Sequence, residues 1–280
     1  MFSIKDVAEY YDTTLLHYEK WWSLKKTLSL HYGICDKSTK TFAESLKNTN
    51  KVLLQISGIS ETDKVLDAGC GVGGAAFFIK CKTNADVIGV SLSKKQINFA
   101  KDIAAKNHMT KEIDFRVMDF TKTTFPNESF DVLWACESVC HVANKTDFIE
   151  ECYRLLKKGG RLILSDFFLT NEHQEDKNYF IEKWKITWGV PNFVTSNFFT
   201  ESLKNRGFEL VKTYDYTNNI RKSARRLYYA SLLGALPSEL YKLINPNVSR
   251  FAKSHYKCGY YQYKALKQSL WKYEVVLAVK

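Results

Sequence analysis

The sequence predicts an α/β protein in which a largely parallel β-sheet is covered by helices on both faces. Between Asp63 and Asp166, short apolar runs such as KVLDAG, DVIGVSL and FDVLWACE alternate with helical stretches such as KKQINFAKDIAAKN and DFIEECYRLLKK. Strands that alternate with helices form right-handed βαβ units, and these units build a parallel sheet. The residues before and after this section show helical periodicity, so helical segments are expected to flank the sheet.

The predicted elements fall into four parts along the chain. Residues 1–58 are expected to form an N-terminal helical cap, because apolar residues recur there every three or four positions. Residues 59–218 contain the strands KVLDAG, DVIGVSL, IDFRVMD, FDVLWACE and GRLILSDFF, a helical insertion at about 171–199, and a further strand in GFELVKTYDY. Residues 219–269 indicate a basic, tyrosine-rich helical insertion that serves as a substrate lid, and WKYEVVLAVK within 270–280 is the expected final strand.

Composition narrows the class of protein further. The chain has 280 residues, of which 45% are hydrophobic and 25% charged, so it can bury a full core and is not a low-complexity or mostly disordered chain. No apolar run reaches the roughly 18 residues of a bilayer span, and the N-terminus does not resemble a signal peptide. The seven cysteines are scattered and include no CxxC pair. We therefore expect a cytoplasmic protein without disulfides or a metal site.

The charge is concentrated near the C-terminus. Residues 219–280 contain twelve lysines and arginines against two glutamates, so this segment carries +10 of the net +11 of the chain. It also contains eight of the sixteen tyrosines. Such a surface suits an anionic substrate, a membrane surface or a nucleic acid, and many of these side chains are also what a solvated helix face would carry.

A glycine-rich loop follows the first predicted strand. The run Asp67-Ala68-Gly69-Cys70-Gly71-Val72-Gly73-Gly74 leads directly into the helix AAFFIK. Glycines in such a loop let the backbone turn tightly and approach a ligand beside a helix N-terminus. The loop therefore predicts a site for a nucleoside-containing cofactor. Because positions 69, 71 and 74 also give the letters G-x-G-x-x-G, this spacing alone leaves a nicotinamide or flavin enzyme open.

The successive motifs of this section resemble those of a known enzyme family. VLDAGCGVGG, VIGVSLSKKQINFA, VMDF, FDVLWACESVCHV and LLKKGGRLILSDFF follow the order and spacing of class I S-adenosylmethionine-dependent methyltransferases across residues 64–168. More narrowly, the segment is similar to the branch that contains sterol, tocopherol, geranyl diphosphate and sarcosine/dimethylglycine methyltransferases. Tyr10-Tyr11-Asp12 and His31-Tyr32-Gly33 resemble the lead-in of that branch.

This resemblance implies a fold and a cofactor. The fold would be a Rossmann-like, doubly wound sheet of seven strands, mostly parallel, with an antiparallel last strand. The cofactor would be S-adenosyl-L-methionine, with S-adenosyl-L-homocysteine as its product. Asp67 would orient the methionine end of the cofactor, while the backbone of Gly69, Gly71 and Gly73 would make room for it.

The residues expected to hold the nucleoside depart in part from the family pattern. An acidic residue usually ends the second strand and holds the ribose hydroxyls, but here the chain reads Val90-Ser91-Leu92-Ser93. In the resembling branch a serine-leucine-serine turn with a later glutamine takes this place, so Leu92 would pack on the adenine and Gln96 would reach the ribose. Ser91 is also expected to bind the cofactor. Asp119 would accept a hydrogen bond from the adenine amino group, with Phe120 against the ring. The missing acid also argues against an NAD enzyme.

The end of the fourth strand carries the residues expected to do chemistry. Cys136-Glu137-Ser138-Val139-Cys140-His141 lies where ligands bind in open α/β sheets, and the resembling branch has a similar glutamate and histidine there. His141 would serve as a general base for an O–H or N–H acceptor. Glu137 would stabilise a cation, remove its proton or hold the cofactor. A helix-capping or packed histidine is the competing interpretation of His141.

Methyl transfer from a sulfonium requires alignment and exclusion of water, so a lid is expected. The residues proposed to form the lid or touch substrate are Tyr10, Tyr11, Tyr18, Trp22, Trp184, Trp188, Arg221 and Arg225. Aromatic rings can stabilise cations, and the arginines suit a diphosphate or carboxylate, although core packing competes as the use of any one of these aromatic side chains.

Taken as a whole, the sequence predicts a methyltransferase that acts on a small, apolar or isoprenoid-like molecule, at carbon, oxygen or nitrogen. Two alternatives stay open: an RNA methyltransferase that uses the basic C-terminal region, and a non-catalytic protein that binds S-adenosylmethionine. The absence of a recognisable RNA-binding module argues against nucleic acid as a partner. Contact with a membrane surface through the basic region, and a homo-oligomer, both remain open.

Overall fold

A computed structural model describes residues 2–21 and 24–280, and its centre is one seven-stranded sheet in the order β3-β2-β1-β4-β5-β7-β6. The strands are β1 (Lys64–Ala68), β2 (Asp86–Ser91), β3 (Ile113–Val117), β4 (Phe130–Cys136), β5 (Leu156–Leu169), β6 (Leu210–Asp215) and β7 (Trp271–Val279). The first five strands pair in parallel, whereas β7 is antiparallel to both of its neighbours, β5 and β6. The predicted fold class is confirmed.

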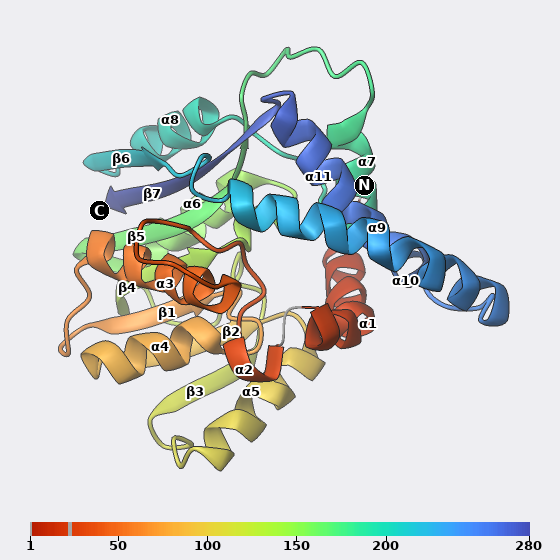
Figure 1. Ribbon diagram of the computed structural model, residues 1–280. Helices are drawn as coiled ribbons and strands as arrows, with labels where there is room; N and C mark the ends of the chain where they lie inside the picture. The colour runs from red at the N-terminus through yellow and green to blue at the C-terminus, as the bar shows by residue number, and fades with distance from the viewer. Residues whose placement is uncertain (1, 22–23) are drawn as a thin grey trace.

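Helices cover both faces of the sheet (Figure 1). The helices of the core are α3 (Phe42–Ser57), α4 (Gly74–Thr83), α5 (Lys94–Lys106), the 3₁₀ turn η1 (Val139–His141), α6 (Lys145–Leu155) and α8 (Ser196–Arg206). Their starts follow from the sequence: Thr41 and Glu44 form a capping box at α3, and the side chains of Ser93 and Asn144 cap α5 and α6.

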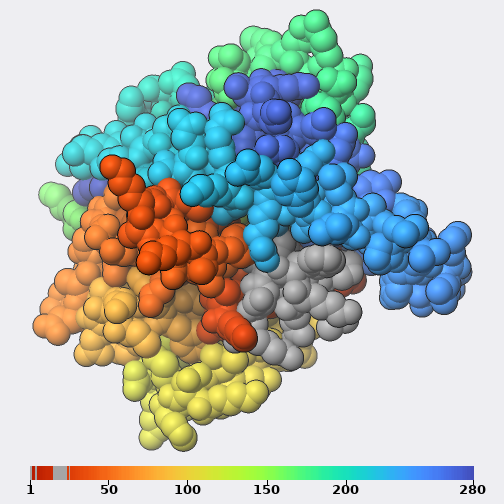
Figure 2. Space-filling model, viewed as in Figure 1, coloured from red at the N-terminus to blue at the C-terminus, as the bar shows by residue number. Residues whose placement is uncertain are grey.

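A second group of helices lies at one end of the sheet. It consists of α1 (Ile4–Trp21), α2 (Leu24–Thr27), α7 (Phe180–Trp188), α9 (Arg221–Ile244), α10 (Arg250–Ser254), η2 (His255–Lys257) and α11 (Cys258–Lys267). In Figures 1 and 2 the far end of α9 projects beyond the rest of the molecule as an arm, and α10, which follows the turn after it, packs on α1 and α7. None of the helices in the described residues has the length and apolar character needed to cross a membrane.

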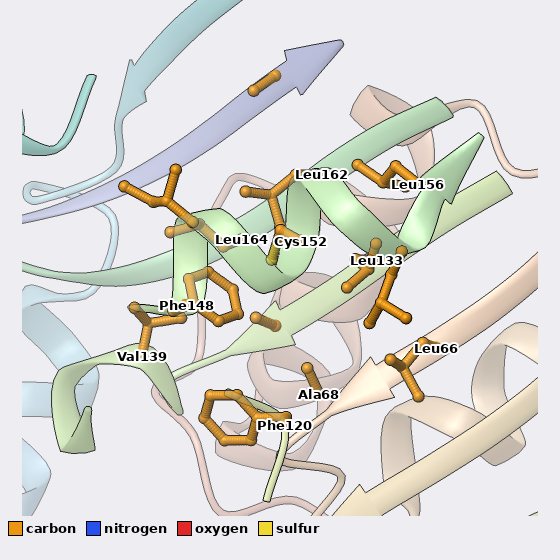
Figure 3. Packing of buried hydrophobic residues seen from close by; sticks show 14 of the residues in the cluster. Leu66, Ala68, Phe120, Leu133, Val139, Phe148, Cys152, Leu156, Leu162 and Leu164 are labelled. Atoms are coloured by element: carbon orange, nitrogen blue, oxygen red, sulfur yellow. The ribbon is translucent and has the colours of Figure 1, made fainter. Parts of the chain in front are cut away.

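Separate apolar clusters hold the layers together. One cluster packs β1, β4 and β5 against α6 and α8, and Figure 3 shows Phe120 beside Ala68 at its edge. A second cluster packs the other face of the sheet against α3, α4 and α5. A third, rich in aromatic rings, joins α1, α7, α9 and α11 to the ends of β5 and β7. The added helices are therefore fixed to the sheet by a core of their own.

Three boundaries differ from the expected ones. The helix predicted in DFIEECYRLLKK ends at Leu155, and β5 begins at the next residue, because Leu156 already pairs with Phe130 of β4. The helical stretch expected from residue 171 begins only at Phe180. The basic helical insertion is interrupted after Ile244 by a turn at residues 245–249, which contains Pro246.

The topology determines where a ligand can bind. β1 pairs with β2 on one side and with β4 on the other. The chain therefore places β2 and β3 on one side of β1, and then crosses to place β4 and the later strands on the other side. In open α/β sheets the crevice at the carboxyl ends of such strands is the ligand-binding position. The glycine loop after β1, the Ser91 turn after β2 and Glu137 after β4 all start from this edge.

Candidate active site

A cavity of about 1240 Å³, its open mouth included, lies at this edge of the sheet. Residues after β1, β2, β3 and β4 form one side of it. The other side comes from the N-terminal part of α1, the loop around Leu30, and Trp188 of α7. The predicted site residues that line it are Tyr11, Asp67, Gly69, Gly71, Ser91, Leu92, Gln96, Asp119, Phe120, Glu137, His141 and Trp188.

Glu137 is held rigidly at the bottom of this cavity. Its Oε1 accepts hydrogen bonds from the backbone amide of Tyr32, at 2.6 Å, and from the hydroxyl of Tyr273, at 2.8 Å. Its backbone adopts φ 51°, a left-handed conformation that an L residue adopts only at a cost and that often marks a functional site. Burial raises the pKa of Glu137 well above its ordinary value. Without a bound cation, burial therefore favours the neutral form of this carboxyl group.

His141 is paired with a tyrosine from the N-terminal helix. The Tyr11 hydroxyl and His141 Nε2 are 2.9 Å apart, and the His141 ring also packs edge-on against Trp188. Burial lowers the pKa of His141 to about 3, so the imidazole is neutral near pH 7 and can accept a proton. Although Glu137 and His141 both line the cavity, their hydrogen-bond partners are different, and η1 rather than an α-helical turn separates them.

A second histidine, His31, lines the same cavity and was not among the predicted site residues. Its Nδ1 lies 2.8 Å from the Tyr32 carbonyl oxygen. Because a carbonyl only accepts, Nδ1 carries the ring hydrogen and Nε2 carries the lone pair. The buried Nε2 has no hydrogen-bond partner in the described part of the chain, and burial lowers the pKa of His31 to about 4. His31-Tyr32-Gly33 resembles the lead-in of the family branch, but no periodicity around it indicates that a loop between two helices brings His31 to the sheet edge.

The surroundings of the Asp67 carboxyl group suit a cationic ligand. It is buried at the end of β1, its Oδ2 has no hydrogen-bond partner among the described residues, and burial raises its pKa to about 7, offset only in part by the Ala76 amide. An unpartnered buried carboxyl group in a ligand-sized cavity is costly unless a ligand completes it. The ammonium and sulfonium groups of S-adenosylmethionine supply the matching charge, so the residues present fit this cofactor.

The nucleoside side of the cavity is organised by short hydrogen bonds. Ser91 Oγ donates to Gln96 Oε1 at 2.8 Å, which holds the glutamine side chain in place. Ser93 caps α5 and donates to the carboxylate of Asp12, so α1 is tied to the turn after β2. The Asp119 Oδ1 accepts from the amide and the hydroxyl of Thr121. These bonds position Ser91, Gln96 and Asp119, three of the five residues proposed for the nucleoside, without the acidic residue that this chain lacks.

One predicted glycine contact is not made at the cavity. Gly73, unlike Gly69 and Gly71, is absent from the cavity wall. A Cβ at Gly73 would lie 2.7 Å from the Phe115 ring, and the residue has φ 86°. Glycine is therefore required at position 73 because this residue caps the start of α4 in a left-handed conformation, packed closely against β3.

Several proposed lid residues also lie elsewhere. Tyr10 and Trp184 are fully buried in the aromatic cluster of the added helices, where the Tyr10 hydroxyl bonds His255 Nδ1 at 2.7 Å. Arg221 and Arg225 are exposed on α9, away from the cavity wall. Trp22 and the side chain of Tyr18 lie outside the described residues. Tyr11 and Trp188 are thus the proposed lid residues that the structure brings to the cavity.

A buried amine supports the turn that carries His141. Lys145 Nζ donates to the carbonyls of Cys140 and Val142, at 3.0 and 2.6 Å, and to that of Asn192, at 3.2 Å. The Asp166 carboxylate accepts from the Cys140 amide at 2.9 Å. Neither charged group lines the cavity, so both act by holding η1 in place. The described residues contain no group of three or more His, Cys, Asp or Glu side chains suited to a metal ion.

Comparison with known proteins agrees with this geometry. A family model described as "Methyltransferase domain" matches residues 66–164. Sterol 24-C-methyltransferase of Saccharomyces cerevisiae is 32% identical over 216 residues, which is 75% of this chain and 54% of that protein. The chain spans about half to two thirds of the length of the curated relatives it matches.

Two solved structures share the fold across nearly the whole chain. The cyclopropane synthase MmaA2 of Mycobacterium tuberculosis superimposes with a TM-score of 0.82 at 17% identity, covering 100% of this chain and 99% of its own. Geranyl diphosphate C-methyltransferase of Streptomyces coelicolor A3(2), solved with Mg²⁺, geranyl diphosphate and S-adenosyl-L-homocysteine, gives a TM-score of 0.76 at 17% identity, covering 99% of this chain and 97% of that chain. At this level of identity the two structures show the fold alone.

Proposed function

The chain belongs to the class I S-adenosylmethionine-dependent methyltransferases, and from this premise we propose that it methylates a small, largely apolar molecule of the isoprenoid or related natural-product type. The observation that carries the proposal is the two-sided cavity. One side holds the carboxyl groups of Asp67, Asp119 and Glu137, and the other side is formed by apolar and aromatic groups of α1 and α7. The first side suits a cationic nucleoside cofactor, and the second suits an apolar acceptor.

The residues proposed to hold the cofactor divide the work between its two ends. When bound, S-adenosylmethionine supplies an electrophilic methyl group on a positively charged sulfur. Asp67 would bind the amino-acid end, and Asp119 and Phe120 would contact the base. Gln96, fixed by Ser91, would contact the ribose. A bound cation also favours the ionised form of the buried carboxyl groups, because opposite charge lowers a carboxyl pKa.

The acceptor side would orient substrate, exclude water and take up a proton. Tyr11 and Trp188 present aromatic surface next to His141, and such surface stabilises a cation as well as an apolar group. For an O–H or N–H acceptor, the neutral His141 would receive the proton at Nε2, the atom that contacts Tyr11. For an alkene carbon, the Glu137 carboxylate would stabilise the cation or remove its proton. Both roles are proposed here for residues at the carboxyl end of β4.

The basic C-terminal region supplies no observation in favour of a nucleic-acid substrate. Three of its tyrosines pack between helices: the Tyr228 ring of α9 stacks on Tyr260 of α11, with centroids 5.6 Å apart, and lies tilted against Tyr263, with centroids 4.9 Å apart. Tyr273 is fully buried and bonds Glu137. These rings are therefore not a free platform on which bases could stack.

The proposal is tested by following a labelled methyl group. The purified protein is incubated with methyl-labelled S-adenosylmethionine and an extract of its source cells, with and without nuclease, and the label is measured in the organic and aqueous phases. We expect label in the organic phase, absent with Asp67→Asn and present with the exposed control Asp102→Asn. Nuclease-sensitive label in the aqueous phase would support an RNA methyltransferase instead. Cofactor binding without any transfer would support a non-catalytic protein.

A further inference from the structure

The long helix α9 carries an unpartnered apolar face. Eight of the thirteen large hydrophobic side chains that are exposed among the described residues belong to this one helix. Seven of them share one face and are called the leucine stripe here: Tyr229, Leu232, Leu233, Leu236, Leu240, Leu243 and Ile244. At 3.6 residues per turn they occupy roughly a third of the helix circumference. The opposite side of α9 is buried against α11, where Gly259 allows close approach to Leu227 and Ser231.

The two most exposed side chains of the stripe lie at its projecting end. Leu232 is 47% exposed, whereas Leu243 and Ile244 are each 79% exposed. These two residues lie at the tip of the arm that stands clear of the body in Figure 2. Contiguous exposed apolar surface of this kind marks an interaction site in a folded protein.

The same face of α9 becomes cationic at its other end. Helical spacing places Lys222, Arg225 and Arg226 on the same face of α9 as the leucine stripe, nearer the start of the helix. All three are exposed. None of them takes part in an ion pair within residues 2–21 and 24–280. Glu239, the single acidic residue of α9, is paired with Lys242. The guanidinium of Arg226 also lies over the Phe42 ring of α3, 4.6 Å from its centroid. The face therefore combines cations that have no ion-pair partner among the described residues with apolar side chains, arranged one after the other along the helix.

We propose that this face of α9 docks on the surface of a lipid bilayer that contains anionic headgroups. The tip of the leucine stripe would enter between the headgroups, and Lys222, Arg225 and Arg226 would stay at the level of the lipid phosphates. Charge complementarity decides against a second copy of the chain. In a dimer with parallel α9 helices, the cationic ends of the two copies would repel each other. In a dimer with antiparallel helices, each cationic end would lie on the leucines of the other copy. Neither arrangement gives these cations an acidic partner, because the one acidic residue of α9 is already paired with Lys242.

The arm is also connected to the cavity. Arg250 of α10 pairs with Asp6 of α1 and stacks over the Phe2 ring, and Phe2 lines the cavity. Phe251 packs between Phe2 and Tyr10. A bilayer held at α9 would thus lie against the helix that forms one wall of the site, which suits an acceptor drawn from a membrane. Docking itself does not depend on that acceptor or on methyl transfer.

The experiment is cosedimentation of the full chain with lipid vesicles. The vesicles consist of phosphatidylcholine alone or of phosphatidylcholine with about one third phosphatidylglycerol, at about 0.05 and about 0.5 M salt. We expect binding to the anionic vesicles that weakens at high salt. The triple variant Leu233→Gln, Leu236→Gln, Leu243→Gln should lose at least about tenfold in affinity, and Lys222→Glu with Arg225→Glu should lose the salt-dependent part. Ile186→Gln, an exposed apolar position on α7, is the matched control and should bind like the unaltered chain.

Three results would overturn the proposal: no binding of the unaltered chain, unchanged binding of the triple variant, or a dimer in sedimentation velocity that the triple variant converts to a monomer. S-adenosylhomocysteine binding measured by calorimetry serves as the folding check for each variant. If the unaltered chain failed to bind this cofactor product yet still bound vesicles, the proposed methyltransferase function would fail while the docking surface would stand.

Discussion

At the scale of single residues, the site is a set of buried groups whose charge depends on what is bound. Glu137 and Asp67 are carboxyl groups with raised pKa values, and His31 and His141 are imidazoles with lowered ones. Burial disfavours the charged form of each of these four groups, and a nearby opposite charge favours it. A ligand that brings positive charge will therefore change the protonation of the site as it binds.

This coupling predicts that S-adenosylmethionine binds more weakly in acid. With its pKa at about 7, Asp67 is mostly protonated at pH 5.5, and the proton must leave before the carboxylate can pair with a cation. We expect the dissociation constant to be roughly tenfold higher at pH 5.5 than at pH 7, with protons released on binding. Titration calorimetry in two buffers of different ionisation enthalpy measures both effects. The same dependence in Asp67→Asn would show that another group is responsible.

A second residue-scale prediction concerns proton transfer. His141→Ala, His31→Gln and Glu137→Gln each leave the fold of the sheet intact, and Gln at position 137 keeps an oxygen for Tyr32 and Tyr273. If His141 is the base, its variant should lower turnover by about 100-fold or more, and the other two should have smaller effects. His31 is the competing base, because its Nε2 lone pair has no partner among the described residues.

The readout is the rate of label transfer to the organic phase, with cofactor affinity measured separately. His173→Ala, at an exposed position, is the control and should match the unaltered chain. A large loss in His31→Gln with near-normal turnover in His141→Ala would reverse the assignment. Unchanged turnover in both Glu137→Gln and His141→Ala would remove these two residues from the reaction.

At the scale of elements, the sequence predicted those parts of the site that follow directly from a strand. Asp67, Ser91 and Glu137 each lie at the carboxyl end of a strand whose apolar run is visible in the sequence, and the parallel sheet brings these ends together. His31 and Tyr273 reach the same place from a loop between helices and from the antiparallel last strand. Their positions depend on packing between segments more than 100 residues apart, which no local pattern encodes.

The same reason explains which lid residues were misplaced. Tyr10 and Tyr11 are neighbours on α1, and the helical turn of 100° per residue directs one toward the aromatic core and the other toward His141. Composition shows that a helix is aromatic, but the side that is buried depends on its partners. The basic charge of α9 was likewise visible in the sequence, whereas the exposed leucine stripe beside it required the packing of α9 on α11.

One contact between elements can be tested by adding a single methyl group. A Cβ at Gly74 would lie 1.9 Å from the carbonyl oxygen of Leu28, which is backbone and cannot rotate away. Gly74→Ala should therefore displace the loop that carries Leu30 and His31 to the cavity and should weaken cofactor binding at least about tenfold. Gly58→Ala is the control: its φ of 62° makes it strained, by about 1–2 kcal/mol, but no atom lies within 4 Å of the added Cβ.

Calorimetry and thermal unfolding separate the two effects of these substitutions. Both variants are expected to melt at a lower temperature than the unaltered chain, and only Gly74→Ala should lose affinity. Equal affinity in the two variants would mean that the loop adapts to the methyl group, and that contact between α4 and the Leu28 carbonyl does not position the cavity wall.

At the scale of the whole molecule, the cavity lies between two separately packed units. Its floor belongs to the sheet, with its own apolar clusters, and its cover belongs to the aromatic cluster of the added helices. The first half of α1 and the loop around His31 contact the floor through specific bonds, such as Tyr11 to His141 and the Tyr32 amide to Glu137, whereas α7, α9 and α11 pack on the ends of β5 and β7. Segments held mainly by such bonds open at lower free energy than the sheet itself.

Ligand binding should therefore stabilise the two units unequally, and hydrogen exchange can measure this. S-adenosylhomocysteine at about 100 times its dissociation constant adds about 2.7 kcal/mol to the free energy of global unfolding. The bound ligand raises the free energy of any opening of the cover that releases it, by up to the same amount. Amides in the first half of α1 and in the loop around His31 should therefore exchange their hydrogens up to about 100-fold more slowly. The edge strand β6 does not line the cavity, and its local fraying should be unchanged. Protection limited to the glycine loop and the Ser91 turn, with none in α1, would show that the added helices do not close over the cofactor.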